Sequence, residues 1–168
     1  MGHARLGGVS HPSLGLPPRD MASGFPAATD RLRGAQARLG ARALEVAMDR
    51  DPTMRERHGE LGLRKLLRDT ETLVDRLALA VGSNDPSTVA AWAEWVVPIY
   101  RRRRVPMDDL IALCDGLRLA VPAVLAPDER PVGEAALDEA VRVFRWHRRI
   151  AGDARKRNRL LALLYKGA

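Results

Sequence analysis

The sequence predicts an all-α protein, a compact bundle of five to seven helices in which a globin-like arrangement is one option. Three observations support this prediction. Apolar residues recur at spacings of three and four through most of residues 30–165, which is the period of an amphipathic helix. No segment alternates apolar and polar residues as a half-buried strand would. Clusters of Pro, Gly and Asp separate the periodic segments.

Composition predicts one helical domain behind a short tail. Residues 1–28 contain five Gly and four Pro without a hydrophobic period, so we expect a flexible, disordered N-terminal tail. Residues 29–168 then form a single helical domain, long enough to bury a core. Because only two Phe and two Tyr are present, that core should consist of Leu, Val and Ala, with the three Trp as its large pieces.

The first half of the domain divides into two helical patterns and a short turn. The first pattern begins at Asp30 and continues to Val46. Asp51-Pro52 ends it and starts a short helical turn through His58. After Gly59 and Gly62, which we expect to interrupt the chain, residues 63–81 form the next helix.

Two helices joined by a short link come next. Pro86 starts a helix whose apolar face contains Val89, Trp92, Val96 and Ile99, so this helix should be buried. Pro98 lies within it and should bend its last turn or end its regular hydrogen bonding.

The second of these helices opens after Val105-Pro106, with Asp108 and Asp109 in its first turn, where the helix dipole favours carboxylates. So short a link requires the pair to pack as a hairpin or a sharp corner. Its apolar stripe consists of Leu110, Leu113, Leu117 and Val121.

The last long helix, residues 132–150, carries two apolar stripes and therefore predicts contacts on two sides. One stripe contains Leu137, Val141 and Phe144, and the other contains Val143, Trp146 and Ile150. A short amphipathic segment, residues 155–165, ends the pattern.

The positive charge of the chain is concentrated in its second half. The net charge is +7, and residues 89–168 hold fifteen bases against ten acids. Such an excess suits an acidic partner or nucleic acid. However, 25 of the 28 bases are arginine in a chain rich in Ala, Gly and Pro, so compositional bias is an alternative explanation.

The most concentrated candidate site is the arginine run at the end of the Trp-containing helix. Guanidinium groups match phosphate oxygens, and aromatic rings can stack on bases. The alternative is a charged helix end at the surface with its aromatics buried, because four consecutive helical residues point in four directions. The candidate residues are Trp92, Trp95, Tyr100, Arg101, Arg102, Arg103 and Arg104.

A second basic surface lies along the last long helix and the segment after it. It could bind an anionic partner, or it could simply keep the helix soluble. A helix-turn-helix interpretation of residues 89–125 is disfavoured, because its second helix would present Asp108 and Asp109 where a recognition helix presents bases or amides. The basic candidates are Arg145, Arg148, Arg149, Arg155 and Arg157.

His147, with Phe144 one turn before it, is the candidate for a ligand pocket. A single histidine on a late helix can ligate a haem iron in an all-α pocket, although such a residue is more commonly a hydrogen-bonded imidazole at the edge of the core. Cys114 has no cysteine partner and should pack inertly. No nucleophile motif, phosphate loop or metal-ligand spacing is present, so we expect no catalytic residues, no metal and no cofactor.

The Trp-containing helix, the arginine run, Val105-Pro106, Asp109-Leu110 and Leu117-Arg118 together resemble a known kind of domain. It is the helical sensor or dimerisation domain, in some cases globin-like without haem, found at the front of bacterial regulatory proteins. The resemblance covers residues 40–126. No output domain follows in this sequence, so the resemblance implies a stand-alone sensor or adaptor, and it carries over no catalytic residues.

We therefore expect a small regulatory or interaction protein that acts by protein-protein contact. A homodimer formed through an apolar helix face is expected, with the basic side free for an acidic partner. The alternatives are a nucleic-acid-binding factor and a haem- or small-ligand-binding globin-like protein. The lone cysteine, and the lack of a signal segment or an apolar run of membrane-spanning length, predict a soluble cytoplasmic protein without a transmembrane segment.

Overall fold

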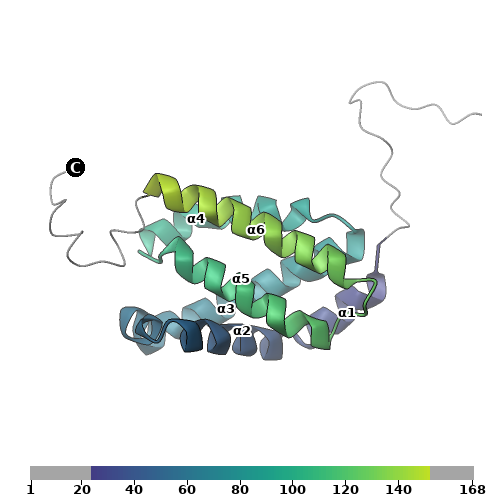
Figure 1. Cartoon of the computed structure of the whole chain (residues 1–168), viewed down its shortest axis with the longest axis horizontal. Helices are drawn as coiled ribbons and strands as arrows, with labels where there is room; N and C mark the ends of the chain where they lie inside the picture. The colour runs from purple at the N-terminus through teal and green to yellow at the C-terminus, as the bar shows by residue number, and fades with distance from the viewer. Residues whose placement is uncertain (1–23, 152–168) are drawn as a thin grey trace, which may run out of the picture.

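The computed structural model describes residues 24–151, and in this range the chain forms α-helices and one 3₁₀ helix with no β-strand (Figure 1). The predicted all-α class is confirmed. Most of the predicted tail, and all of the segment 155–165, lie outside the described residues. The elements are α1 (Pro26–Gly34), α2 (Gln36–Arg50), α3 (Thr53–Ser83), α4 (Ser87–Arg102), α5 (Met107–Ala120), the 3₁₀ helix η2 (Val121–Ala123) and α6 (Arg130–Ala151).

Helix α5 lies between α2 on one side and α6 on the other, as Figure 1 shows. Helix α3 supports the rest of the bundle through contacts with α1, α2, α4 and α6. Helix α4 packs mainly on α6 and α3. The expected apolar stripe of α5, which includes Leu110, Leu113 and Leu117, is buried along its length.

The core consists of Leu, Val, Ala and Met side chains with Phe144 and Tyr100 as its buried aromatics. The expectation that the three tryptophans form its large pieces is wrong. Trp95 is 68% exposed, Trp146 is 57% exposed, and Trp92 is half-buried. Helix α4, for example, buries the side that carries Val89, Ala93 and Val96, which leaves Trp95 on its outer side.

Gly116 shows how close that approach is. A Cβ atom at this position would lie 2.4 Å from the carbonyl oxygen of Ala43, so the backbones of α5 and α2 are in direct contact. Because only glycine leaves this space free, the α2–α5 contact depends on that residue.

The first helical pattern starts earlier than expected and is split in two. Helix α1 begins at Pro26, inside the predicted tail, and the side chain of Ala28 is fully buried. At Ala35 the chain leaves helical geometry before α2 starts. The Gln36 amide donates to the carbonyl oxygen of Glu71 (2.7 Å), which ties the start of α2 to α3.

The expected interruption at Gly59 is present, but Gly62 lies within a regular helix. Gly59 adopts φ +59°, a left-handed conformation that other residues rarely take, and it divides α3 into a short N-terminal part and a long C-terminal part. The short part carries Arg57 and His58 to the start of α5.

Helix α4 turns sharply into α5. Pro98 does not end the helix, which continues to Arg102 with the proline on its exposed side. Arg104 adopts φ +57°, and Pro106 then starts α5. Helices α4 and α5 make few contacts with each other, so the link is a corner and not a hairpin.

Candidate functional site

The four consecutive arginines at the end of α4 do not form one binding site. Arg101 turns to α6, while Arg103 turns to α3, and Arg102 and Arg104 are exposed without an acidic partner among residues 24–151. This divergence follows from the 100° rotation per helical residue. The cluster therefore cannot present four guanidinium groups to a single phosphate.

Arg103 has a structural role. Its Nη1 donates to Asp69 Oδ2 (2.6 Å), and its guanidinium carbon lies 5.4 Å from the centre of the Tyr100 ring. Burial, together with the hydrogen-bonded Asp69 carboxylate, raises the pKa of Tyr100, so its hydroxyl remains protonated. The cavity that Tyr100 shares with Trp92 and Phe144 holds only about 10 Å³, room for a single water and for no larger ligand.

His147 has both ring nitrogens engaged. Arg101 Nη2 donates to Nδ1 (3.3 Å), which leaves Nε2 as the donor to Glu94 Oε2 (2.7 Å). The histidine therefore joins α6 to α4 as a hydrogen-bonded imidazole. Phe144, one turn earlier, is buried in the core and lines the small cavity beside Tyr100.

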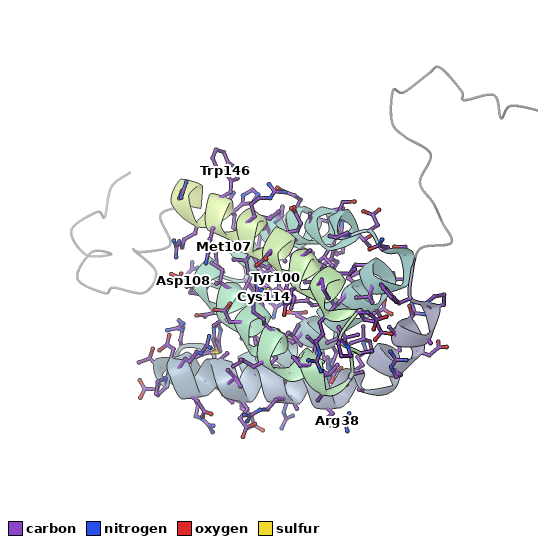
Figure 2. All side chains as sticks on the ribbon, turned by 45° about the vertical axis from the view of Figure 1, so that its right-hand side comes forward. Arg38, Tyr100, Met107, Asp108, Cys114 and Trp146 are labelled. Carbon is purple, nitrogen blue, oxygen red and sulfur yellow. The ribbon has the colours of Figure 1, made fainter. Side chains whose placement is uncertain are left out.

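A groove of about 530 Å³ lies between α5 and α6. Trp146, more than half exposed, forms part of its wall near the end of α6 (Figure 2). Helix α6 also supplies Arg142, Arg145 and Arg149, and α5 supplies Arg118 and Asp115. Spacings of three and four place these α6 side chains on one side of the helix.

The charges of the groove are only partly paired. Arg118 donates to Asp138 (2.6 Å), Arg142 donates to Glu139 (2.5 Å), and Asp115 accepts from Arg50 (3.3 Å). Arg145 and Arg149 are exposed and have no acidic partner within the described chain. The groove thus combines an exposed indole with two guanidinium groups available to an anion.

The other basic candidates predicted from the sequence are Arg148, Arg155 and Arg157. Arg148 donates to Asp108 (2.8 Å) and fixes the end of α6 to the start of α5. Arg155 and Arg157 lie outside the described residues. Of the predicted basic surface, Arg145 and Arg149 are therefore the members without an acidic partner among residues 24–151.

Sequence reasoning missed a buried ionic cluster around Asp109. Arg57 donates Nε and Nη2 to the two carboxylate oxygens (3.1 and 2.8 Å), and His58 Nε2 lies 2.6 Å from Oδ2. Arg57 also donates to Asp51 (3.0 Å). The side chain of Asp109 is 2% exposed, so this helix-start residue is an anchor between α5 and α3. The sequence showed only that Asp109 lies in the first turn of a helix. Its partners Arg57 and His58 are about fifty residues away in the chain, so their contact with Asp109 could not be predicted.

Cys114 is fully buried on α5, and burial raises the pKa of its thiol to about 12. A thiol so protonated and so enclosed is a poor nucleophile. Among residues 24–151, no three His, Cys, Asp or Glu side chains gather closely enough to hold a metal ion. The helices in that range also include none with the length and apolarity needed to cross a membrane.

Comparison of the chain with protein-family models, curated proteins and solved structures gives no match. The resemblance to helical sensor or dimerisation domains stays a prediction. What the protein binds must therefore be argued from the geometry of its surface.

Proposed function

We propose that this chain is a small regulatory or adaptor protein that binds an acidic segment of a partner protein in the groove between α5 and α6. The observation that carries this proposal is that Arg145 and Arg149, which have no acidic partner in the described part of the chain, lie beside the exposed ring of Trp146. Tryptophan and arginine are the residues that contribute most to binding at protein interfaces. We infer a cytoplasmic location, since the lone cysteine of the chain is compatible with a reducing compartment.

The acids of the same groove favour a protein partner over nucleic acid. Asp115, Asp138 and Glu139 line it together with the arginines. A phosphate backbone carries a negative charge at every nucleotide, so some of its charges would lie against these carboxylates. A peptide can instead place Glu or Asp opposite Arg145 and Arg149, which have no acidic partner among residues 24–151, and apolar side chains opposite the acids.

A haem- or ligand-binding function receives less support. The two ring nitrogens of His147 are occupied by Arg101 and Glu94, so an iron ligand would first have to break both hydrogen bonds. The cavity beside Phe144 is far smaller than any cofactor.

Fluorescence anisotropy with labelled probes tests the proposal. The probes are an acidic amphipathic peptide rich in Glu and Leu, the same peptide with Gln in place of Glu, and a single-stranded oligonucleotide. We expect the acidic peptide to bind more tightly than the other two probes, with affinity that falls as salt is added. In the double variant Arg145→Ser/Arg149→Ser, loss of two charge-assisted hydrogen bonds should weaken binding roughly tenfold or more.

A matched control removes the same charge elsewhere. Arg38 on α2 and Arg55 on α3 are exposed and without acidic partners in the described range, and Figure 2 shows Arg38 on the far side of the molecule from Trp146. The variant Arg38→Ser/Arg55→Ser should bind the peptide as the wild type does. Equal losses in both double variants, or tighter binding of the oligonucleotide than of the peptide, would contradict the proposal.

A further inference from the structure

The outer face of α4 is an apolar strip that no helix within residues 24–151 covers. Ala91, Trp95 and Pro98 are exposed along it, and Trp92 and Ile99 are half-buried at its edge. Spacings of four and three place Ala91, Trp95 and Pro98 in one row along the helix. The strip shares no residue with the groove between α5 and α6.

The sequence predicted that the wide apolar face of this helix would be buried, and the structure buries only part of that face. The buried residues are Val89, Ala93, Val96, Val97 and Tyr100. A tryptophan with 68% of its surface exposed, in a row of apolar neighbours, is typical of an interaction surface.

We propose that this strip is the interface of a homodimer in which the α4 helices of two copies pack antiparallel, with Trp95 of each copy over Ala91 of the other. The first argument is size. Ala91 lies one turn before Trp95, so an antiparallel pair centred between them places the largest side chain of each strip over the smallest. A two-fold axis forms both contacts at once.

The second argument is charge. An antiparallel pair brings the C-terminal end of α4, where Arg102 and Arg104 have no acidic partner in residues 24–151, toward the N-terminal end of the other copy. Asp85 lies at that end, where its carboxylate accepts from Ser87. A parallel pair would instead bring the two arginine-rich ends together. The antiparallel arrangement also opposes the two helix dipoles favourably.

The strip itself specifies an apolar occupant. Within residues 91–98 the charged side chain is that of Glu94, which already accepts a hydrogen bond from His147 at the α6 side. An acidic partner would find no guanidinium group within the row from Ala91 to Pro98. A second copy supplies the matching apolar row and the complementary charges at its ends.

The direction of the salt effect separates this contact from the groove. Each copy carries a net charge of +7, so the two copies repel each other at long range. Salt screens this repulsion as well as the attraction between the charged helix ends, and the apolar contact does not depend on it, so moderate salt should not weaken the dimer. The same salt should weaken binding of an acidic peptide to the groove, so failure of either proposal is recognisable without the other.

Sedimentation equilibrium of the full chain tests the dimer. The wild type should change from monomer to dimer as its concentration rises, and Trp95→Glu should remain monomeric with an unchanged helical circular dichroism spectrum. Trp146→Glu, which places the same charge on the other strongly exposed tryptophan, should dimerise as the wild type does. A wild type that is monomeric up to roughly millimolar concentration, or a Trp95→Glu variant that still dimerises, would overturn the proposal.

Disulfide cross-linking tests the orientation. In the antiparallel pair Thr88 of one copy lies near Pro98 of the other, so a mixture of Thr88→Cys and Pro98→Cys should form cross-linked heterodimers. Neither variant alone should cross-link efficiently, and the native Cys114 is buried and does not interfere. Cross-linking of each variant with itself would indicate a parallel pair and would overturn the proposed orientation.

Discussion

The cluster around Asp109 and the groove between α5 and α6 are built from the same residue types, yet the structure uses them differently. In the cluster, Arg57 and His58 converge on one carboxylate that is 2% exposed. In the groove, each acid meets one arginine, and Arg145 and Arg149 remain unpaired in the described chain. An arginine that is buried and hydrogen-bonded to carboxylates, such as Arg57, therefore stabilises the fold. An exposed arginine without such a bond is available to a partner.

The difference follows from where the residues sit. Asp109 is in the first turn of α5, facing the kinked start of α3, where water is excluded. Loss of the Asp109 carboxylate leaves Arg57 with Asp51 as its remaining partner in the cluster and removes the carboxylate beside the buried His58, which is costly. Arg145 and Arg149 are exposed near the end of α6, so their loss leaves no acid of the described chain without its partner.

The largest effect should come from Asp109→Ala. Removing the carboxylate leaves Arg57 and His58 poorly compensated, and the free energy of unfolding should fall by about 3 kcal/mol or more. This corresponds to a drop in melting temperature of roughly 10 °C for a domain of this size. Chemical denaturation measures this loss of stability.

The control is Asp138→Ala, which removes an exposed partner of Arg118 and should lower the free energy of unfolding by about 1 kcal/mol or less. Equal losses in the two variants would contradict the distinction between the cluster and the groove.

A somewhat smaller effect is expected at the contact that positions α5, the helix that both regions share. In Gly116→Ala the new methyl group meets the Ala43 carbonyl, so α2 and α5 must separate, at a cost of about 1–3 kcal/mol. Thermal unfolding measures the loss. Gly34→Ala is the matched control because a Cβ there meets open space, and this variant should be neutral or slightly stabilised.

The ion pair between Glu129 and Arg31 lies outside both regions. Its contribution to the free energy of unfolding should be smaller than that of Asp109 and should depend on pH. The Arg31 hydrogen bond, aided by the Ala126 amide, lowers the pKa of Glu129 below its ordinary value of 4.5. The ionised carboxylate therefore stabilises the folded state above that ordinary value, and this contribution is lost as the pH falls through the lower folded pKa.

Glu129→Gln should accordingly be less stable than the wild type at neutral pH, with a loss smaller than that of Asp109→Ala. The two proteins should converge in acid, where the wild-type carboxyl is protonated too. Denaturation curves measured at a series of pH values provide the comparison. A difference that persists unchanged to the lowest pH would show that the carboxylate charge is not its source.

The sequence predicted the helices well because their signals are local. The Pro86 and Pro106 starts, the Gly59 interruption and the stripe of α5 each follow from neighbours in the chain. The sequence could not show which side of an apolar helix faces the core. Helix α4 is apolar nearly all round, and only packing against α3 and α6 determines that Val96 is buried and Trp95 exposed.

The candidate site was predictable only in part, for the same reason. Arg145 and Arg149 were recognised from their position on a basic helix. Only the structure shows that these two have no acidic partner among residues 24–151, whereas Arg101, Arg103 and Arg148 bond to residues 34 to 46 positions away. Long-range pairing of this kind leaves no periodic trace in the sequence.

The most direct test of the proposed binding groove is to measure both the melting temperature and the affinity for the acidic peptide in the variant Arg145→Ser/Arg149→Ser. The account predicts a melting temperature within about 2 °C of the wild type, as for exposed substitutions, with affinity for the acidic peptide reduced roughly tenfold or more. A large fall in melting temperature would show that these arginines hold the fold. Unchanged affinity for the peptide would show that the groove is not where the partner binds.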